Sequence, residues 1–266
     1  MKIAIIGAGN MGCAIAGGFI ASHKVVASDI VVSNPSTGKL NALAGKYPGI
    51  RTTTNNISAA CDANIVILAV KPWKVESVVT EIRPHLNLNN VIIASVAAGV
   101  STAQLGAMLQ TDTMQQLPPL YYIIPNTAAS VGQSMTFISG AHTMAQSDNY
   151  ICALFEGLGR VMMVEERLIG ACMALSSCGL AYAMRYVRAS VEGAVELGLP
   201  PTQAQDIVLQ TLQGAVALLG RDNAHPEAEI DKITTPGGLT IRGLNAMEQA
   251  GFTSAVIAGL RASVKN

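Results

Sequence analysis

The chain begins with a short apolar run, residues 3–6, that leads directly into the glycine-rich turn Gly7-Ala8-Gly9-Asn10-Met11-Gly12. The next residues, 13–20, suit a helix. A strand, a glycine turn and a helix in this order are what a Rossmann-type dinucleotide site requires, because the glycines permit a tight turn, close approach of a pyrophosphate and close helix packing. The N–H groups that open the helix then attract the anion. The sequence therefore predicts a dinucleotide contact at Gly7, Gly9, Asn10, Met11 and Gly12.

Strand and helix signals alternate as far as residue 163. Residues 64–70 and 91–96 are continuous apolar runs, which indicate strands that are covered on both faces, as in a parallel sheet. Further strands are expected at 30–33, 120–124, 135–139 and 161–164, and helices at 36–45, 73–82, 102–109 and 147–158. The predicted fold class is α/β, with a doubly wound Rossmann-type dinucleotide-binding domain over residues 1–163.

After residue 164 the strand signals stop. A long helix is expected over 165–197, and Thr202 is expected to cap a helix over 203–219. Two more helices are expected at 241–250 and 254–264. Half of all residues are hydrophobic and only 13% are charged, which is more apolar surface than a monomer needs. We therefore expect residues 164–266 to form an all-helical dimerisation and substrate domain that builds a homo-oligomer.

Charge and residue usage exclude several classes of partner. Lys plus Arg and Asp plus Glu both total 17, so no basic excess attracts nucleic acid or a membrane surface. The 5 cysteines form no Cys-x-x-Cys pair, and the chain is not small and disulfide-dense, so we expect small buried hydrophobic cysteines in a reducing, cytoplasmic compartment. The 4 scattered histidines predict no metal site. The glycines of the first turn interrupt any secretory apolar core. The uncharged segment 168–184 has the length of a short membrane span, but its serines and glycines favour a buried interface helix.

The segment after the second strand bears on the choice of cofactor. NAD sites usually place a carboxylate there, whereas this chain reads Ser33-Asn34-Pro35-Ser36-Thr37. Without a carboxylate to repel a 2′-phosphate, and with donors on Ser33 and Asn34, the expected cofactor is NADPH, with NADH possible. Lys39 is the nearest cation, because the segment has no arginine. The alternative is a polar loop in which Ser36 only caps a helix.

Two further segments are candidate ligand contacts. Asn56 and the run Ala69-Val70-Lys71-Pro72 lie near strand ends, where ligands of open parallel sheets gather, although Lys71 could also be a solvated strand end. In the second half of the chain, Thr234-Thr235-Pro236-Gly237-Gly238-Leu239-Thr240 leads into a helix, and its backbone N–H groups can converge on an anion. The alternative for this loop is an ordinary helix entry that Thr240 caps.

With these motifs the chain resembles the pyrroline-5-carboxylate reductases over nearly its whole length. The matching segments are Gly7-Ala8-Gly9-Asn10-Met11, Val32-Ser33-Asn34, Ala69-Val70-Lys71-Pro72, Ala97-Ala98-Gly99, Pro125-Asn126-Thr127, His225-Pro226 with Asp231, and Pro236-Gly237-Gly238-Leu239-Thr240. The resemblance implies NADPH-dependent reduction of 1-pyrroline-5-carboxylate to L-proline by a dimer. It adds Ala97, Ala98 and Asn126 to the cofactor contacts.

The resemblance also implies where the substrate binds. Its carboxylate would meet Thr234, Thr235, Gly237, Gly238, Leu239 and Thr240, and the Thr240 hydroxyl would lie near the ring nitrogen as the candidate catalytic group. The chain departs from the family pattern at three places. The family usually has Arg-Val-Met-Pro-Asn where this chain has Tyr122-Ile123-Ile124-Pro125-Asn126. It usually has Ser-Gly-Ser-Gly-Pro where this chain has Ser176-Ser177-Cys178-Gly179-Leu180. It usually has an arginine where this chain has Pro35.

Two other functions fit the same layout. A 3-hydroxyacid dehydrogenase would share the first domain, but such enzymes generally use a lysine on the long helix, and residues 168–184 contain none. A dinucleotide-binding regulator without catalysis would explain the three departures. An assay with NADPH and 1-pyrroline-5-carboxylate separates these hypotheses.

Overall fold

The structure is a computed structural model that describes residues 1–111 and 116–264. It divides into two compact units, Met1–Met173 and Ala174–Asn266. The first unit extends beyond the predicted boundary at residue 163, because Ile169 of the short helix α7 (Ile169–Met173) is buried in a small apolar cluster with Phe137 of the sheet.

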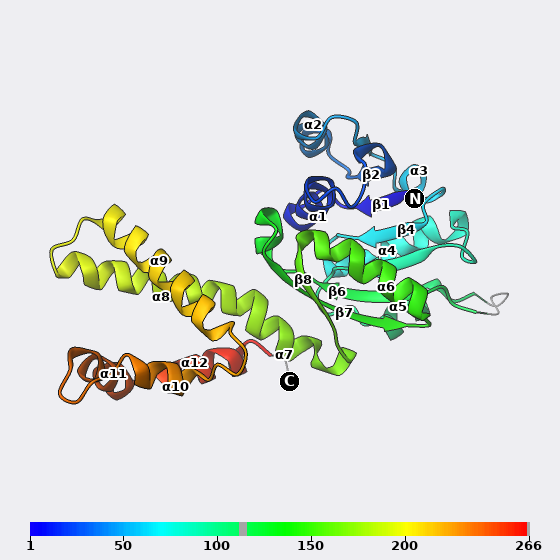
Figure 1. The fold of residues 1–266 in the computed structure, drawn as a ribbon. Helices are drawn as coiled ribbons and strands as arrows, with labels where there is room; N and C mark the ends of the chain where they lie inside the picture. Colours follow the sequence, from blue (N-terminus) through cyan, green and yellow to red (C-terminus); the bar gives the residue numbers. More distant parts are fainter. Residues whose placement is uncertain (112–115, 265–266) are drawn as a thin grey trace. The chain divides into compact units, whose positions relative to one another are not determined.

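The first unit is built on an eight-stranded sheet in the order β3-β2-β1-β4-β5-β6-β7-β8 (Figure 1). Neighbouring strands are parallel except β6 and β7, which run antiparallel, and β8 follows the direction of β7. The parallel core and the predicted strands are confirmed, whereas the reversal at β7 and the short edge strand β3 were not predicted. The strands are β1 (Ile3–Ile6), β2 (Ile30–Ser33), β3 (Arg51–Thr53), β4 (Ile65–Leu68), β5 (Ile92–Ser95), β6 (Leu120–Ile124), β7 (Ser134–Ala141) and β8 (Gly159–Met163).

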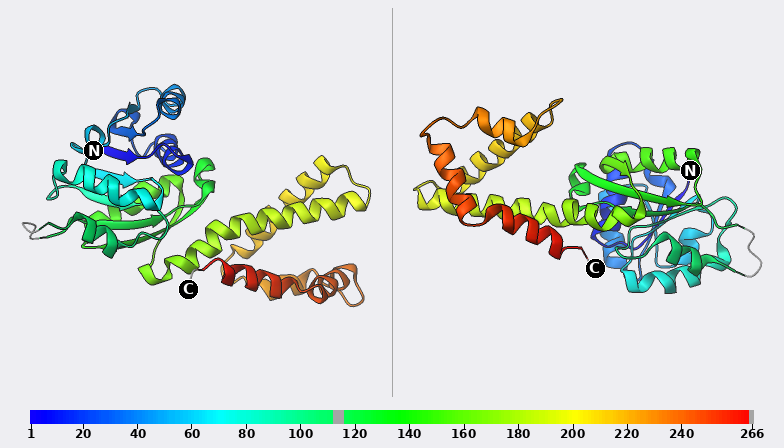
Figure 2. Two further views of the ribbon diagram at one scale, coloured as in Figure 1. Left: turned by 180° about the vertical axis from the view of Figure 1, so that it is seen from behind. Right: turned by 90° about the horizontal axis from the view of Figure 1, so that it is seen from below.

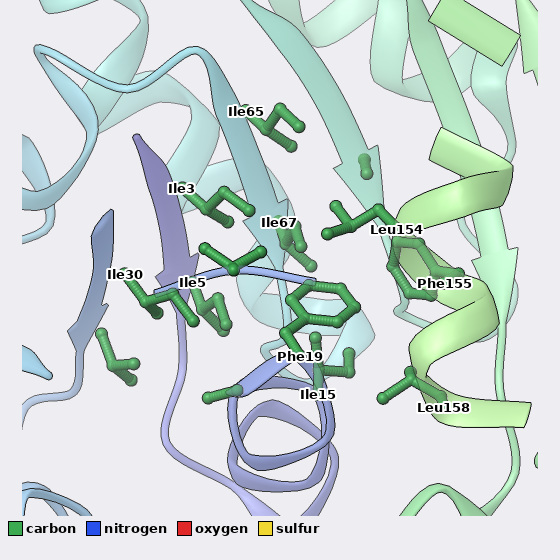
Figure 3. Close-up of a cluster of buried hydrophobic side chains, with 14 of the residues drawn as sticks. Ile3, Ile5, Ile15, Phe19, Ile30, Ile65, Ile67, Leu154, Phe155 and Leu158 are labelled. Carbon is green, nitrogen blue, oxygen red and sulfur yellow. The ribbon is translucent and has the colours of Figure 1, made fainter. Parts of the chain in front are cut away.

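Helices cover both faces of this sheet (Figure 2). Because successive strand residues point to opposite faces, Ile3 and Ile5 of β1 pack with one set of helices and Ala4 and Ile6 with the other. On the first face, Phe19 and Phe155 meet edge to face with ring centroids 5.2 Å apart (Figure 3). The first face carries α1 (Asn10–Ala21), α2 (Thr37–Lys46) and α6 (Ala145–Phe155), and the second carries α3 (Asn56–Ala60), α4 (Pro72–Ile82) and α5 (Thr102–Leu109).

Short 3₁₀ turns connect the main elements of the first unit. They are η1 (Ala27–Asp29), η2 (Arg83–His85), η3 (Thr127–Val131), η4 (Glu156–Leu158) and η5 (Glu166–Leu168). The turn η4 ends the helix that the sequence extends to residue 158, so α6 stops at Phe155.

The second unit is entirely helical in its described residues. The predicted long helix is confirmed, since helical backbone runs without a break from Glu166 to Glu196, but it includes a π-helical turn, η6. The predicted cap Thr202 is wrong. Helix α9 begins one residue earlier, at Pro201, whose missing N–H needs no partner at that position. The elements are η6 (Ala174–Cys178), α8 (Gly179–Glu196), α9 (Pro201–Leu219), α10 (Pro226–Lys232), α11 (Leu239–Gln249) and α12 (Phe252–Ala262).

This helical unit has almost no interior of its own. Among its described residues, Ala174 and Ala204 are the only hydrophobic side chains that are buried. Large apolar side chains are instead exposed along α8 and the turn before it, with Leu175 66% and Met184 61% exposed. By length and composition the helical stretch Glu166–Glu196 could cross a membrane, but a single helix of this kind is weak evidence for a span.

Candidate dinucleotide and substrate sites

The ends of four parallel strands meet at one edge of the sheet. Backbone hydrogen bonds align the strand ends: Gly7 N–H donates to the Ser33 carbonyl at 2.8 Å, and Ala69 N–H donates to the Ile6 carbonyl at 2.8 Å. Val96 N–H donates to the Leu68 carbonyl at 3.0 Å. The segments that follow β1, β2, β4 and β5 are therefore neighbours, and this edge of an open α/β sheet is where ligands bind.

The three glycines of the first turn differ in what surrounds them. Gly7 has φ +115°, and a Cβ there would lie 2.5 Å from the Ala69 carbonyl oxygen. A Cβ on Gly12 would lie 1.9 Å from the Gly7 oxygen, so only glycine lets α1 pack this close to the strand end. A Cβ on Gly9 would meet no atom within 4 Å. Gly7 and Gly12 therefore serve the fold, and the space at Gly9 is free for a ligand.

The start of α1 is suited to an anion. Gly9 is its N-cap residue and offers no capping side chain, and the first turn holds no acidic residue. Asn10 is exposed in that turn, and Met11 is half-buried against the core. Backbone N–H groups at a helix start carry a partial positive charge, so the geometry of the turn fits a pyrophosphate.

Asn34 connects the glycine turn to the segment after β2. Its Oδ1 accepts a hydrogen bond from Ala8 N–H at 3.2 Å, and its Nδ2 donates to Ser36 Oγ at 2.9 Å. Ser36 is the N-cap residue of α2, yet its hydroxyl makes no capping hydrogen bond. Ser36 therefore occupies the cap position of the alternative interpretation, but its side chain makes no capping bond. Lys39 is exposed in the first turns of the same helix.

Two other predicted cofactor residues hold each other. Ser33 is buried, and its hydroxyl donates to Asn56 Oδ1 at 2.7 Å. Asn56 Nδ2 in turn donates to Glu81 Oε2 at 2.8 Å. Both polar ends of the Asn56 side chain thus have protein partners, so Asn56 supports the strand ends. Contact between these two side chains and a cofactor stays a prediction.

The segment Ala69-Val70-Lys71-Pro72 links β4 to α4. Ala69 and Val70 are half-buried, and Lys71 is the exposed N-cap residue of α4. Pro72 occupies the first helical position, where no N–H is needed. This segment lies beside the glycine turn, since the Gly7 backbone approaches both Ala69 and Val70.

The segments after β5 and β6 hold the remaining predicted cofactor contacts. Ala97 is buried and Ala98 is exposed. Asn126 is buried, donates from its backbone N–H to Ser134 Oγ at 3.1 Å, and accepts from Ala128 N–H at 3.0 Å through its side chain. Asn126 therefore fixes the turn η3 that follows β6.

Sequence reasoning missed two functional candidates at this end of the sheet. Tyr122 Oη accepts a hydrogen bond from Gly99 N–H at 2.8 Å. The Glu166 carboxylate accepts one from Thr102 N–H at 3.1 Å and another from the Thr102 hydroxyl. Burial raises the pKa of the Tyr122 phenol by more than the hydrogen bond from Gly99 N–H lowers it, and the Glu166 charge raises it further, so Tyr122 stays neutral. The departure from the family pattern at Tyr122 was the available signal.

In the helical unit, the threonine- and glycine-rich loop leads into α11 as predicted. Gly237 has φ +70°, and Gly238 is the N-cap residue of α11 without a capping side chain. A Cβ on Gly238 would lie 2.5 Å from Thr235 Oγ1 and 3.0 Å from the Thr235 carbonyl oxygen, so the turn leaves little room for a side chain there. Leu239 and Thr240 are the first two helical residues and both are exposed, so the interpretation of Thr240 as the cap is wrong.

The start of this loop is held by its own threonine. Thr234 Oγ1 donates to the Asp231 carbonyl at 3.1 Å, and Gly238 N–H donates to the Thr235 carbonyl at 2.9 Å. The N–H groups at the start of α11 lack a side-chain cap, which suits a small carboxylate. Among the described residues, no three His, Cys, Asp or Glu side chains are grouped as metal ligands would be.

The fold of the first unit and its glycine-lined edge define a dinucleotide-binding protein of the Rossmann class. Residues 166–266 match the family described as "Pyrroline-5-carboxylate reductase dimerisation", and residues 2–99 match "NADP oxidoreductase coenzyme F420-dependent". Pyrroline-5-carboxylate reductase 3 of Danio rerio is 35% identical over 99% of this chain and 89% of its own length. The chain belongs to the pyrroline-5-carboxylate reductase family.

Two further comparisons agree with this assignment. Pyrroline-5-carboxylate reductase 1 of Dictyostelium discoideum is 36% identical over 97% of this chain, and the match spans 48%, about half, of that protein's length. The crystal structure of Plasmodium falciparum pyrroline carboxylate reductase with NADP bound has a TM-score of 0.88. It covers 99% of this chain and 95% of its own, and at 24% identity the likeness shows the shared fold.

Proposed function

We propose that this chain reduces 1-pyrroline-5-carboxylate to L-proline with NADPH. The observation that carries the proposal is the loop before α11. It has the Pro-Gly-Gly-x-Thr pattern of the family, and it leads into a helix start that no side chain caps. This loop occurs in a chain that matches a protein named pyrroline-5-carboxylate reductase 3 over nearly its whole length.

The residues at the sheet edge fit a dinucleotide. Bound NADPH supplies the hydride that the reaction needs. Gly9, Asn10 and the following N–H groups of α1 would hold its pyrophosphate, because that helix start has neither a cap nor an acidic residue. The uncapped start of α2 and the exposed Lys39 would receive a 2′-phosphate, and Asn34 offers no negative charge to repel it.

The loop in the helical unit supplies the substrate contacts. N–H groups of Leu239 and Thr240 at the start of α11 would bind the substrate carboxylate. The Thr240 hydroxyl, exposed in that first turn, would hydrogen-bond the ring nitrogen. Reduction adds one hydride to the imine carbon and one proton to the nitrogen, and a protonated imine is the better electrophile. Since a threonine hydroxyl is a weak acid, orientation of the ring should supply most of the rate enhancement.

The proposed assembly is a homodimer formed by the helical unit. An isolated helical unit would leave Leu175 and Met184 in water and would bury only two small side chains among those described. A second copy that covers these side chains gives the unit the core that it lacks. A balanced charge of 17 basic and 17 acidic residues further supports an enzyme without nucleic-acid or membrane partners, and the cysteine usage supports a reducing, cytoplasmic compartment.

The decisive experiment follows the absorbance of NADPH when 1-pyrroline-5-carboxylate is added to the purified protein, with proline quantified as the product. Stoichiometric proline formation supports the proposal. Binding of NADPH without turnover would identify a regulator instead. Turnover with 3-hydroxyacids but not with the imine would identify a dehydrogenase of similar layout.

A further inference from the structure

Tyr122 has no role in the proposed reaction, but it links β6 to the loop that follows β5. It lies on β6 opposite Ser95, the last residue of β5, and its side chain is only 7% exposed. The ring packs with Phe137 and Ile169, while its hydroxyl oxygen accepts the hydrogen bond from Gly99 N–H. The ring is therefore fixed by apolar packing, and the oxygen reaches the loop that follows β5.

That loop is the predicted cofactor segment Ala97-Ala98-Gly99. Ala98 and Gly99 are exposed, and Gly99 has φ +84°. Within the loop, Ala97 N–H donates to Ser95 Oγ at 3.3 Å and Val100 N–H donates to the Ala97 carbonyl at 3.3 Å. These bonds close the turn onto itself. The bond from Gly99 to Tyr122 instead connects the exposed tip of the loop to the neighbouring strand.

The far end of the loop is held by a second bond to another element. Glu166 of η5 accepts hydrogen bonds from both the N–H and the hydroxyl of Thr102, the first residue of α5. The same segment then continues into α7, whose Ile169 belongs to the same apolar cluster as Tyr122. The conformation of the loop is thus set from β6 on one side and from η5 on the other.

Tyr122 stands at one of the places where this chain departs from the family pattern. The family pattern has arginine at this position. A guanidinium is a donor only and cannot accept a hydrogen bond from Gly99 N–H, whereas a phenol oxygen can. The contact therefore exists because this chain departs from the pattern.

We propose that Tyr122 is a positioning residue for the dinucleotide, which acts by fixing the tip of the Ala97–Gly99 loop through the Gly99 N–H. The identity of the ligand rests on the function proposed above. Without the hydroxyl, the loop tip samples other conformations, and NADPH must order it on binding.

The neighbouring residue provides a matched control. Tyr121 is fully buried, and its hydroxyl donates to Asp148 Oδ1 of α6 at 2.8 Å, on the other face of the sheet. Tyr121→Phe and Tyr122→Phe each delete one phenol oxygen from the same strand. Only the second deletes a bond to the loop.

The test compares the two variants in the free protein and with NADPH. In Tyr122→Phe, the Gly99 amide should exchange its hydrogen about tenfold faster, as followed by NMR. The Kd for NADPH by titration and the KM for NADPH should rise about three- to tenfold, with kcat changed less than about twofold, as expected when ground-state binding is lost. Tyr121→Phe should lower the melting temperature and leave Gly99 exchange and the Kd within about twofold of wild type.

Three outcomes would overturn the proposal: unchanged Gly99 exchange in Tyr122→Phe, an unchanged Kd despite faster exchange, or an equal rise in Kd for both variants. Neither amide exchange nor the titration needs the substrate. If the wild-type protein fails to reduce 1-pyrroline-5-carboxylate, the proposed function fails, and these two measurements still decide the role of Tyr122.

Discussion

The side-chain oxygen of Asn34 accepts a hydrogen bond from the Ala8 N–H at 3.2 Å, and this bond joins the end of β2 to the glycine turn that follows β1. The other end of the Asn34 amide donates to Ser36 at the start of α2. One side chain therefore sets the relative position of the two helix starts that would receive the pyrophosphate and the 2′-phosphate.

Asn34→Asp should weaken the preference for NADPH. An aspartate keeps an oxygen for Ala8 N–H but loses the donor to Ser36 and adds a negative charge beside the place of the 2′-phosphate. The ratio of kcat/KM for NADPH to that for NADH should fall about tenfold, which corresponds to about 1.4 kcal/mol. The control is Asn64→Asp. The Asn64 Oδ1 likewise accepts a backbone hydrogen bond, from the Lys2 N–H, but it does so at the opposite ends of the strands, where β1 begins. An equal change in both variants would contradict this account.

The wild-type protein should favour NADPH over NADH, but only modestly, and Pro35→Arg should increase that preference. Pro35 is exposed between β2 and α2, where an arginine could pair with two oxygens of a phosphate. We expect the ratio of kcat/KM values to rise about three- to tenfold in the variant. Steady-state kinetics with both cofactors measure it. A wild-type preference for NADH would refute the assignment of the cofactor.

Gly9→Ala and Gly12→Ala should fail in different ways. A Cβ on Gly9 meets no atom within 4 Å, so this variant should fold normally and lose NADPH affinity, because the methyl group enters the space for the pyrophosphate. A Cβ on Gly12 would lie 1.9 Å from a backbone oxygen, so that variant should lose about 2 kcal/mol or more of stability or fail to fold. Melting curves and NADPH titrations of both variants separate the two effects.

Thr240→Ala should lower kcat by roughly ten- to a hundredfold if its hydroxyl holds the ring nitrogen, about 1.4 to 2.7 kcal/mol of transition-state stabilisation. The Kd for NADPH should barely change, and Thr240→Ser should retain most of the activity. Because Gly238 is the N-cap residue of α11, we expect almost no loss of stability. An unchanged kcat with a lower melting temperature would show that Thr240 is only structural.

Charges on the exposed apolar side chains of the helical unit should dissociate the oligomer. Leu175→Glu and Met184→Glu place a carboxylate at positions that are 66% and 61% exposed in the single chain. Val26→Glu is the control, since Val26 is equally exposed, at 65%, but lies in the first unit. Met173 is a poorer choice, because it packs against the cluster of Phe137 and Ile169, and a charge there would disturb folding.

Sedimentation velocity at micromolar concentration measures this effect. We expect a dimer or larger assembly for the wild type and for Val26→Glu, and a smaller species for the two variants in the helical unit. A monomeric wild type would contradict the proposed assembly.

Much of the fold could be predicted because the strands are long apolar runs. Ile65–Leu68 is fully buried on both faces, and a short apolar run of this kind has few possible structures other than a strand in the middle of a covered sheet. The edge strand Arg51–Thr53 was missed, since it has only three residues and none of them is buried. The direction of β7 could not be predicted either, because a run of buried residues such as Thr136–Ser139 is compatible with a strand that runs either way. The π-helical turn at Ala174–Cys178 has no signature in composition.

The candidate site could be predicted only where residue type dictates geometry. Gly7 and Gly12 were assigned correctly to the turn and the close packing, because no other residue fits those positions. The hydrogen bond from Gly99 to Tyr122 depends on the register of β5 against β6. The hydrogen bonds of the Asn56 side chain with Ser33 and Glu81 depend on tertiary packing. Neither relationship is encoded in local sequence.

The sparse interior of the helical unit has a consequence for how its stability must be measured. In the proposed dimer, a unit whose described residues bury only Ala174 and Ala204 among their hydrophobic side chains would gain much of its folding free energy from its partner, so mass action would enter the unfolding equilibrium. In the proposed dimer, each tenfold dilution removes about 1.4 kcal/mol from the free energy that separates folded dimer from unfolded chains. Melting temperatures measured at two protein concentrations a hundredfold apart should therefore differ, and that difference distinguishes a substitution that weakens association from one that weakens the fold of a single chain.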